Sequence, residues 1–296
     1  EPFTEEEEIE AKLKELKSAA PSTLGLSPKD VKSLGNVAAK TLVPIFNKIL
    51  ATGEFPEEWM EAKIQFLHKK GDKQDPANYR FLSVENPWLK LFTKILASRI
   101  SEFAEERALL PGMQFAFRRH LSTASAVTLF HEIVRERLEP GSKKVDESIQ
   151  MQHNYDTRSK SGGKTKSFRV SKEKSERTYV AFIDLKRAFP SVQRNILDQK
   201  MINLGFPKVL RCLILNIFNG LAMHIVSGNE FASPVKTTVG LPEGDCLSPI
   251  LFAIFIADVE SFLHHRAPTL GGKERKSIFF ADDGAIFAIS ADELQK

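Results

Sequence analysis

The chain has 296 residues, of which 42% are hydrophobic and 27% are charged, and its formal net charge is +4. This length and composition suffice for one or two folded domains with a buried core. No apolar run approaches 18 residues, and no basic segment followed by an apolar one stands at the start, so we expect neither a membrane span nor a secretory signal. Two cysteines, Cys212 and Cys246, form no disulfide or metal-binding pattern and predict a reducing, intracellular compartment.

The first fifty residues predict helices. Thr4 precedes an acidic run at residues 5–8, which favours a helix N-terminus through the macrodipole, and Pro21 ends that helix. A second helix is predicted to begin at Ser27-Pro28 and to be kinked or broken at Pro44.

The next segment predicts a β-hairpin followed by two helices. Residues 61–68 alternate as a strand, residues 69–73 form a basic turn, and residues 79–84 return as the second strand. Residues 88–103 carry one broad apolar stripe and predict an amphipathic helix whose stripe belongs to the core. Residues 124–138 predict another helix.

A basic, low-complexity insertion is predicted over residues 139–178. Within residues 141–177, ten Lys or Arg accompany five Asp or Glu, so this stretch carries the whole positive excess of the chain. It is rich in Ser, Gly and Lys and has no apolar periodicity, so we expect it to be disordered. Such a loop either contacts nucleic acid or is simply solvated, and composition leaves both possibilities open.

Two segments in the C-terminal half place acidic residues at the ends of predicted strands. Residues 178–184 form a strand of buried type that ends at Asp184, and residues 277–287 form a hairpin whose turn contains Asp282 and Asp283. Carboxylates on rigid strands suit a pair of divalent cations that assists phosphoryl transfer. Each motif also has a structural interpretation, because Asp caps helices and Asp-Asp-Gly suits a turn. Since side chains alternate along a strand, one of the adjacent aspartates points elsewhere unless the turn re-aims it.

Between these segments lies a loop with two glycines, Gly240 and Gly244, which allow a ligand to approach the backbone closely. Ser248-Pro249 then predicts the start of an apolar helix over residues 250–258, with Ser248 as its N-cap. By itself this segment favours a purely structural role.

Taken in order, these three segments resemble the palm of a reverse transcriptase, most closely that of the non-LTR (LINE-type) retrotransposons. The family patterns F-x-D-L-x-x-A-F, G-x-x-Q-G-D-x-L-S-P and F/Y-A/x-D-D stand here as F-I-D-L-K-R-A-F, G-L-P-E-G-D-C-L-S-P and F-A-D-D. Upstream, residues 75–84 are similar to D-P-x-N-Y-R-P-I-S-L, and residues 114–123 are similar to Q-x-G-F-R-x-x-x-S-T. The resemblance covers nearly the whole chain, residues 3–290.

The resemblance implies an α+β fold with a palm, an antiparallel sheet backed by helices, and a fingers subdomain of helices and a β-hairpin. Residues 1–138 would form the fingers with an N-terminal helical segment, and residues 179–296 a palm truncated before the thumb. The implied function is RNA-directed DNA polymerase, which extends a DNA 3′ end on an RNA template by two-metal nucleotidyl transfer.

The implied cofactors are two Mg²⁺ ions, with Mn²⁺ as a substitute. The implied partners are an RNA template, a DNA primer or target and deoxynucleoside triphosphates, without a membrane. The family also implies a longer polyprotein with an endonuclease and a thumb, located in the nucleus, the cytoplasm or both.

The resemblance assigns metal and template contacts to five residues. Asp184 and Asp282 would bind the ions directly, and Asp283 would be a supporting carboxylate. The Leu185 carbonyl would help to hold the nucleotide-bound ion. Arg118 would contact the template backbone.

The resemblance also assigns nucleotide contacts. Lys69 or Lys70, together with Arg80, would hold the triphosphate, and the Arg fork suits phosphate because it can bind bidentately. Gly244 would lie against the nucleotide. Phe189 occupies the steric-gate position, where a bulky ring would collide with a ribose 2′-hydroxyl and select deoxynucleotides.

Several departures from the family pattern leave alternatives open. Glu243 stands beside the implied nucleotide where the family has Gln, and its carboxylate would repel a triphosphate unless it is protonated or turned away. Phe81 replaces a Pro, and residues 19–26 lack the glycine of the family's A-P-G-P-D-G. With the absent thumb, these departures favour as the alternative a catalytically inactive or repurposed nucleic-acid-binding remnant. An RNA-dependent RNA polymerase is disfavoured by Phe189 and by F-A-D-D in place of G-D-D.

Overall fold

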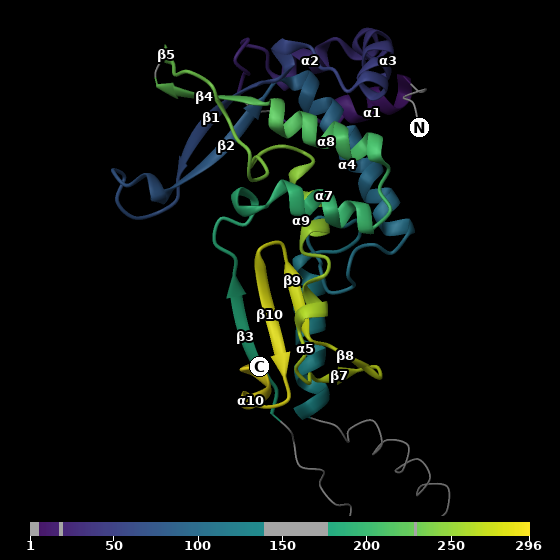
Figure 1. The fold of residues 1–296 in the computed structure, drawn as a ribbon, viewed down its shortest axis with the longest axis vertical. Coiled ribbons are helices and arrows are strands. Elements are labelled where there is room, and N and C mark those ends of the chain that lie inside the picture. The colour runs from purple at the N-terminus through teal and green to yellow at the C-terminus, as the bar shows by residue number, and fades with distance from the viewer. Residues whose placement is uncertain (1–5, 18–19, 139–176, 228–229) are drawn as a thin grey trace, which may run out of the picture. The chain divides into compact units, whose positions relative to one another are not determined.

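The computed structural model describes residues 6–17, 20–138, 177–227 and 230–296. It is a mixed α+β fold that divides into two compact units (Figure 1). The first unit comprises Glu1–Arg119 and Leu185–Asp258, and the second comprises His120–Asp184 and Val259–Lys296. Among the helices of the described ranges, none combines the length and the hydropathy needed to cross a membrane.

The predicted boundaries at residues 138 and 179 separate the expected fingers, insertion and palm. The two compact units of the structure have other boundaries. The chain passes between the units three times, after Arg119, after Asp184 and after Asp258. The predicted insertion at residues 139–178 lies outside the described residues, apart from its last two positions.

The N-terminal helices are α1 (Glu6–Lys14), α2 (Pro28–Ser33) and α3 (Gly35–Thr52). The predicted start at Ser27-Pro28 is confirmed, because Ser27 and Asp30 form a reciprocal capping box. The predicted break at Pro44 is wrong, because Pro44 lies inside α3 and the interruption falls at Leu34-Gly35. Burial of one apolar face of α3 outweighs the single hydrogen bond that Pro44 removes.

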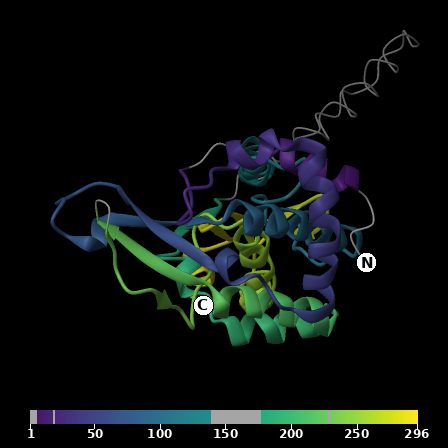
Figure 2. The same cartoon turned by 90° about the horizontal axis from the view of Figure 1, so that it is seen from above.

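The first unit contains a sheet in the order β2-β1-β4-β5, and β6 also pairs with β4. Its hairpin consists of β1 (Glu61–His68) and β2 (Tyr79–Glu85), which confirms both predicted strands. β4 (Ala222–Ser227) runs parallel to β1, as Figure 2 shows from above. The short strands β5 (Glu230–Phe231) and β6 (Val235–Lys236) complete the sheet, and the 3-10 turns η1 (Glu57–Trp59) and η2 (Pro76–Asn78) flank the hairpin.

Helices α4 (Pro87–Glu106), α7 (Arg194–Asn203), α8 (Lys208–Gly220) and α9 (Ser248–Phe255) form most of the remaining first unit. The predicted amphipathic helix at residues 88–103 is therefore confirmed. Its buried Phe92 contacts Phe46 and Phe55 edge-on, with ring centroids 5.1 Å and 5.5 Å apart. This aromatic cluster lies in one continuous core that includes residues of α7, α8 and α9.

The second unit contains an antiparallel sheet in the order β3-β10-β9, formed by β3 (Tyr179–Asp184), β10 (Asp283–Ala288) and β9 (Ser277–Phe280) (Figure 1). The helix α5 (Thr123–Leu138) packs on it through Phe130, whose ring contacts Phe182 and Phe287. The predicted hairpin and the predicted helix at residues 124–138 are confirmed. β3 is not a buried strand, because it lies at the sheet edge and leaves Phe182 79% exposed.

Shorter elements complete the described chain. The 3-10 turn η3 (Phe189–Ser191) belongs to the first unit. In the second unit, η4 (Val259–Phe262) precedes a small ribbon of β7 (Thr269–Leu270) and β8 (Lys273–Glu274), and α10 (Ala291–Leu294) follows β10.

Candidate active site

The register between β3 and β10 brings two of the predicted carboxylates together. Asp184, the last residue of β3, pairs directly with Asp283, the first residue of β10. Residues opposite each other on antiparallel strands share a face, with Cβ atoms about 4.5–5.5 Å apart. The expectation that Asp184 lies beside the hairpin on an antiparallel sheet is therefore confirmed. Its direct neighbour is Asp283, whereas Asp282 lies in the turn.

The chemistry of these side chains fits a divalent cation, although the three are not gathered around one point. Within the described residues, no hydrogen bond or ion pair engages the carboxylates of Asp184, Asp282 or Asp283, and Asp184 and Asp283 are exposed. The same residues contain no group of three His, Cys, Asp or Glu close enough to hold a metal ion. The alternation of side chains explains this, because Asp282 and Asp283 are consecutive and only one of them faces Asp184.

The backbone is strained next to both acidic segments. Ala281, immediately before Asp282, has φ +59°, and Arg187, three residues after Asp184, has φ +53°. A residue with a Cβ in this left-handed region costs roughly 1–2 kcal/mol. Such strain persists only where the surrounding structure imposes it, and it is concentrated at functional sites.

In the first unit, the loop at residues 240–245 is held by backbone contacts on two sides. On one side Gly240 N–H donates to the Val192 carbonyl at 2.9 Å, and Leu241 N–H donates to the Phe189 carbonyl at 2.8 Å. On the other side Ser83 N–H of β2 donates to the Glu243 carbonyl at 2.6 Å. The loop therefore connects β2 with the segment that carries Phe189.

The two loop glycines serve this internal packing. A Cβ on Gly240 would lie 2.7 Å from the Pro190 carbonyl oxygen, and a Cβ on Gly244 would lie 2.6 Å from the Ser83 carbonyl oxygen. Both residues also have positive φ. The sequence predicted room for a ligand at these positions, but the protein's own backbone fills it.

The buried Arg194 of α7 supports the same loop from within. Its guanidinium donates to the carbonyls of Gly240 (2.8 Å) and Phe218 (3.0 Å), and to the side chains of Asn219 (2.9 Å) and Thr237 (2.8 Å). Burial lowers the pKa of Arg194, and these acceptors compensate the buried charge. No sequence pattern distinguished Arg194 from a surface arginine.

Asp245, and not Ser248, caps helix α9. Its Oδ1 accepts hydrogen bonds from the backbone N–H groups of Leu247 (2.8 Å) and Ser248 (3.1 Å). The Ser248 hydroxyl instead donates to the Pro242 carbonyl at 2.7 Å. The predicted N-cap at Ser248 is therefore wrong, although an acidic residue three positions ahead of a Ser-Pro start was a usable signal.

Two of the predicted nucleotide contacts, Arg80 and Phe189, lie beside this loop, and a third, Glu243, belongs to it. Arg80 Nε lies 3.7 Å from a Glu243 carboxylate oxygen, and the two side chains are 51% and 24% exposed. Phe189 is half-buried between Phe117 and Phe252, with ring centroids 6.1 Å and 5.1 Å away. The negative charge of Glu243 is therefore partly compensated by Arg80, which the sequence did not predict.

Lys69 and Leu185 are the other predicted nucleotide-binding or metal-binding residues of the first unit. Lys69 follows β1 at the exposed end of the hairpin, and its backbone N–H donates to the Asn78 carbonyl at 2.9 Å. Leu185 packs at the edge of the core. Leu185 directly follows Asp184 in the chain, so the backbone itself joins the carboxylate-bearing strand to this unit.

The contacts of Arg118 give it a structural role. Its guanidinium forms a bidentate pair with Glu105 through two 2.7 Å hydrogen bonds and donates to the Pro111 carbonyl at 2.8 Å. The hydrogen bonds from Arg118 lower the pKa of Glu105. The predicted template contact of Arg118 would require these bonds to break.

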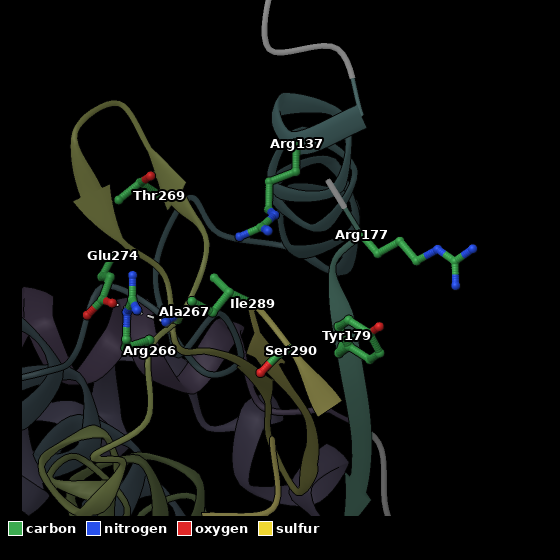
Figure 3. A pocket seen from close by; sticks show the side chains of 9 residues that line it. All are labelled: Arg137, Arg177, Tyr179, Arg266, Ala267, Thr269, Glu274, Ile289 and Ser290. Atoms are coloured by element: carbon green, nitrogen blue, oxygen red, sulfur yellow. Dashed lines mark hydrogen bonds between the residues drawn. The ribbon is translucent and has the colours of Figure 1, made fainter. Parts of the chain in front are cut away.

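A basic pocket in the second unit lies at the other end of its sheet from the carboxylates. Its volume is about 670 Å³, and its lining includes three arginines and one acidic residue, Glu274. Figure 3 shows Arg137 of α5 directed toward the pocket and Arg177 directed away from it. Tyr179 on its wall pairs with Ala288, five residues along the strand from the Asp184–Asp283 pair.

Comparison with known proteins places these features in a family context. Residues 67–296 match the family described as reverse transcriptase (RNA-dependent DNA polymerase). A probable RNA-directed DNA polymerase from transposon BS of Drosophila melanogaster is 26% identical over 230 residues, which cover 77% of this chain and 22% of that protein. The RNA-directed DNA polymerase from mobile element jockey of the same species is 26% identical over 273 residues, or 92% of this chain and 26% of that protein.

A third relative is the retrovirus-related Pol polyprotein from a type-1 retrotransposable element R2 of Nasonia vitripennis. It is 25% identical over 253 residues, which cover 85% of this chain and 21% of the polyprotein. The chain thus spans between a fifth and about a quarter of the length of these relatives.

We expect Ala281→Gly to stabilise the second unit, because glycine adopts the positive φ of this turn without a Cβ clash. The gain in unfolding free energy should be roughly 0.5–1 kcal/mol, since glycine also increases the freedom of the unfolded chain. Chemical denaturation measures it. The matched control is Ala288→Gly in β10, which has no positive φ and a fully buried side chain, and which should lose stability. A loss at both positions would show that Ala281 is not strained.

Proposed function

The chain belongs to the reverse transcriptase family, and on this basis we propose that it is the RNA-directed DNA polymerase core of a non-LTR retrotransposon. The observation that carries the proposal is the pairing of Asp184 with Asp283 across adjacent strands. Two exposed carboxylates on one face, without a cation or hydrogen-bond donor among the described residues, have oxygens available for a divalent metal. The three motifs that bear site residues occur in the order typical of the family.

Reverse transcriptases generally use divalent metal ions, and the residues of this chain fit that requirement. Asp184 and Asp283 would hold Mg²⁺ (or Mn²⁺) from facing strands, whereas Asp282, which the resemblance names as a direct ligand, does not face Asp184. When bound, two such ions lower the pKa of an attacking 3′-hydroxyl and neutralise charge on the phosphate. The left-handed turn at Ala281 fixes where Asp282 and Asp283 leave the backbone.

The residues of the first unit would select and orient the nucleotide. Arg80 is half-exposed at the sheet edge beside the loop, and its fork would bind a triphosphate. Phe189 is held from both sides by aromatic rings, so it cannot easily retreat from a ribose 2′-hydroxyl. Lys69, at the end of the hairpin, would add a second positive charge.

The proposed partners follow from this chemistry: an RNA template, a DNA primer or target and deoxynucleoside triphosphates. Because the matched relatives are much longer, we also propose that the chain acts within a larger protein. The catalytically inactive or repurposed nucleic-acid-binding remnant stays as the alternative, favoured by the carboxylate of Glu243 at the nucleotide side. A primer-extension assay separates the two.

We expect the purified chain to extend a DNA primer on an RNA template with Mg²⁺ and deoxynucleotides, and Asp184→Asn to reduce the rate at least about 100-fold. Losing one preorganised electrostatic contact at a reacting centre typically costs that much. Asp292→Asn, which changes an exposed carboxylate of α10, is the control and should leave the rate unchanged. A folded wild type without extension would favour the remnant, and an active Asp184→Asn would remove Asp184 from the site.

Phe189→Val should relax sugar selection. The smaller side chain leaves room for a 2′-hydroxyl, so the ratio of ribonucleotide to deoxynucleotide incorporation should rise at least about tenfold, an effect of more than 1 kcal/mol. Single-nucleotide incorporation measures this ratio. Phe231→Ala, at a half-exposed ring of β5, is the control. An unchanged ratio in a folded variant would mean that Phe189 only packs the core.

Glu243→Gln should lower the KM for the deoxynucleotide by about fivefold, equivalent to about 1 kcal/mol. Gln can accept or donate a hydrogen bond without adding negative charge, and it frees Arg80 from its ion pair. Steady-state kinetics on one template measure the change, with the exposed Glu54→Gln as control. If the KM stays the same while Asp184→Asn is inactive, the carboxylate of Glu243 is an accommodated variant.

A further inference from the structure

Two neighbouring carboxyl groups are buried where β2 meets the loop at residues 240–245. Glu85 is the last residue of β2 and is 4% exposed, and Asp245 ends the loop and is 5% exposed. Glu85 Oε2 and Asp245 Oδ2 are shielded from solvent and receive no hydrogen bond of normal geometry from an N–H or hydroxyl donor. Asp245 is a neighbour of Glu85, and its negative charge acts on the Glu85 carboxyl group. Two ionised carboxylates are not stable in such a place, so the pair must hold a proton.

The surrounding hydrogen bonds place this proton on Glu85. Asp245 Oδ1 accepts two backbone N–H groups at 2.8 Å and 3.1 Å, which favours its ionised form. Glu85 accepts only a long hydrogen bond from the Ser83 hydroxyl, at 3.4 Å. Burial raises the pKa of Glu85 well above its usual range, and the negative charge of Asp245 raises it further. Burial also raises the pKa of Asp245.

Other titratable or polar groups around the pair come from α4, β2 and the loop. Lys90 of α4 attracts the ionised form of Glu85 and so opposes the rise of its pKa. The positive charge of Lys94 of α4 likewise opposes the rise of the pKa of the Cys246 thiol. The Thr93 hydroxyl also faces Asp245 and favours its ionised form. Glu243, whose carbonyl accepts the Ser83 N–H, forms an ion pair with Arg80.

We propose that Glu85 is a positioning residue that ties the loop at residues 240–245 to β2 by donating a hydrogen bond from its protonated carboxyl group to Asp245. The tie acts where the backbones already meet, since Ser83 N–H binds the Glu243 carbonyl and Gly244 packs on the Ser83 carbonyl. Loss of the proton leaves two buried negative charges beside each other, and their repulsion separates the loop from β2. The role in nucleotide binding rests on the proposed function, whereas the tie itself does not.

The sign of the pH dependence follows from the raised pKa of Glu85. A protonated Glu85 stabilises the closed loop, so this stabilisation is fully present below the ordinary carboxyl pKa. It is lost as the pH rises toward and through the raised pKa of Glu85 in the closed loop. The loop should therefore open more often in alkaline than in acidic solution.

Cys246 provides a probe of this opening that requires no nucleotide, template or metal. It directly follows Asp245, and burial raises the pKa of its thiol to about 12, so alkylation in the closed loop is slow. In a Cys212→Ser background, which removes the exposed second cysteine, we would measure the alkylation of Cys246 by iodoacetamide from pH 5.5 to pH 9. Comparison with Glu85→Gln at each pH cancels the ionisation of the thiol in the opened loop, whereas in the closed loop Glu85 itself contributes to the raised pKa of this thiol. Gln keeps a donor to Asp245 but has no proton to lose.

We expect the ratio of alkylation rates, wild type over Glu85→Gln, to rise by up to about tenfold per pH unit until the raised pKa of Glu85 is passed. Asp245→Asn should also remove the excess pH dependence, because repulsion requires both charges. This second variant keeps the test valid if Glu85→Gln does not fold. Glu61→Gln, at the other glutamate of the same hairpin, should behave as wild type. A ratio that stays flat across this pH range overturns the proposal.

The same variants separate this inference from the proposed function. If the chain is an active polymerase, the nucleotide KM of the wild type should increase with pH relative to that of Glu85→Gln, with a smaller change in kcat. A rising alkylation ratio without any primer extension would support the tie and reject the polymerase. Primer extension with a flat alkylation ratio would support the polymerase and reject the tie.

Discussion

The register between β3 and β10 is the constraint on which the candidate site depends. Side chains alternate along both strands, so a slip of one residue would direct Asp184 and its neighbour to opposite faces of the sheet. The register is fixed by packing, because Phe130 of α5 contacts Phe182 on β3 and Phe287 on β10. Apolar contacts along the two strands thus determine which carboxylates face each other at their end.

In the first unit, the irregular loop at residues 240–245 is held in place without the regular hydrogen bonding of paired strands. Each side of the loop uses backbone hydrogen bonds, and the glycines permit contacts that a Cβ would prevent. The remaining polar groups are satisfied by two buried charged side chains, Arg194 and Asp245. Buried charges are costly unless they are paired or hydrogen-bonded, and here each one binds several backbone groups. The loop is therefore held in its closed position by hydrogen bonds to groups of the same unit.

The sequence predicted regular elements well and the contacts of charged residues poorly. The hairpin at residues 61–84, the helix at residues 88–103 and the aspartate-bearing strands follow from local periodicity, and all are present. The predicted break at Pro44 was wrong because burial of the apolar face of α3 outweighs the low helix propensity of proline. Arg118, Arg194 and Glu85 are typical surface residues by type, and only the tertiary fold gives them buried partners. A family motif can name a position, but it cannot show which neighbours surround it.

Two carboxyl groups near the loop at residues 240–245, those of Glu243 and Glu85, are compensated in different ways. Glu243 replaces a neutral residue beside the loop, but Arg80 of the adjacent strand lies 3.7 Å from it. The tolerance for this carboxylate therefore depends on how closely β2 approaches the loop, and that approach is set by Ser83 and by the Glu85–Asp245 contact. A second acidic residue in the same region, Glu85, is acceptable because it is protonated. One extra carboxyl group is thus compensated by a cation and the other by a proton, and both compensations require the same alignment of loop and strand.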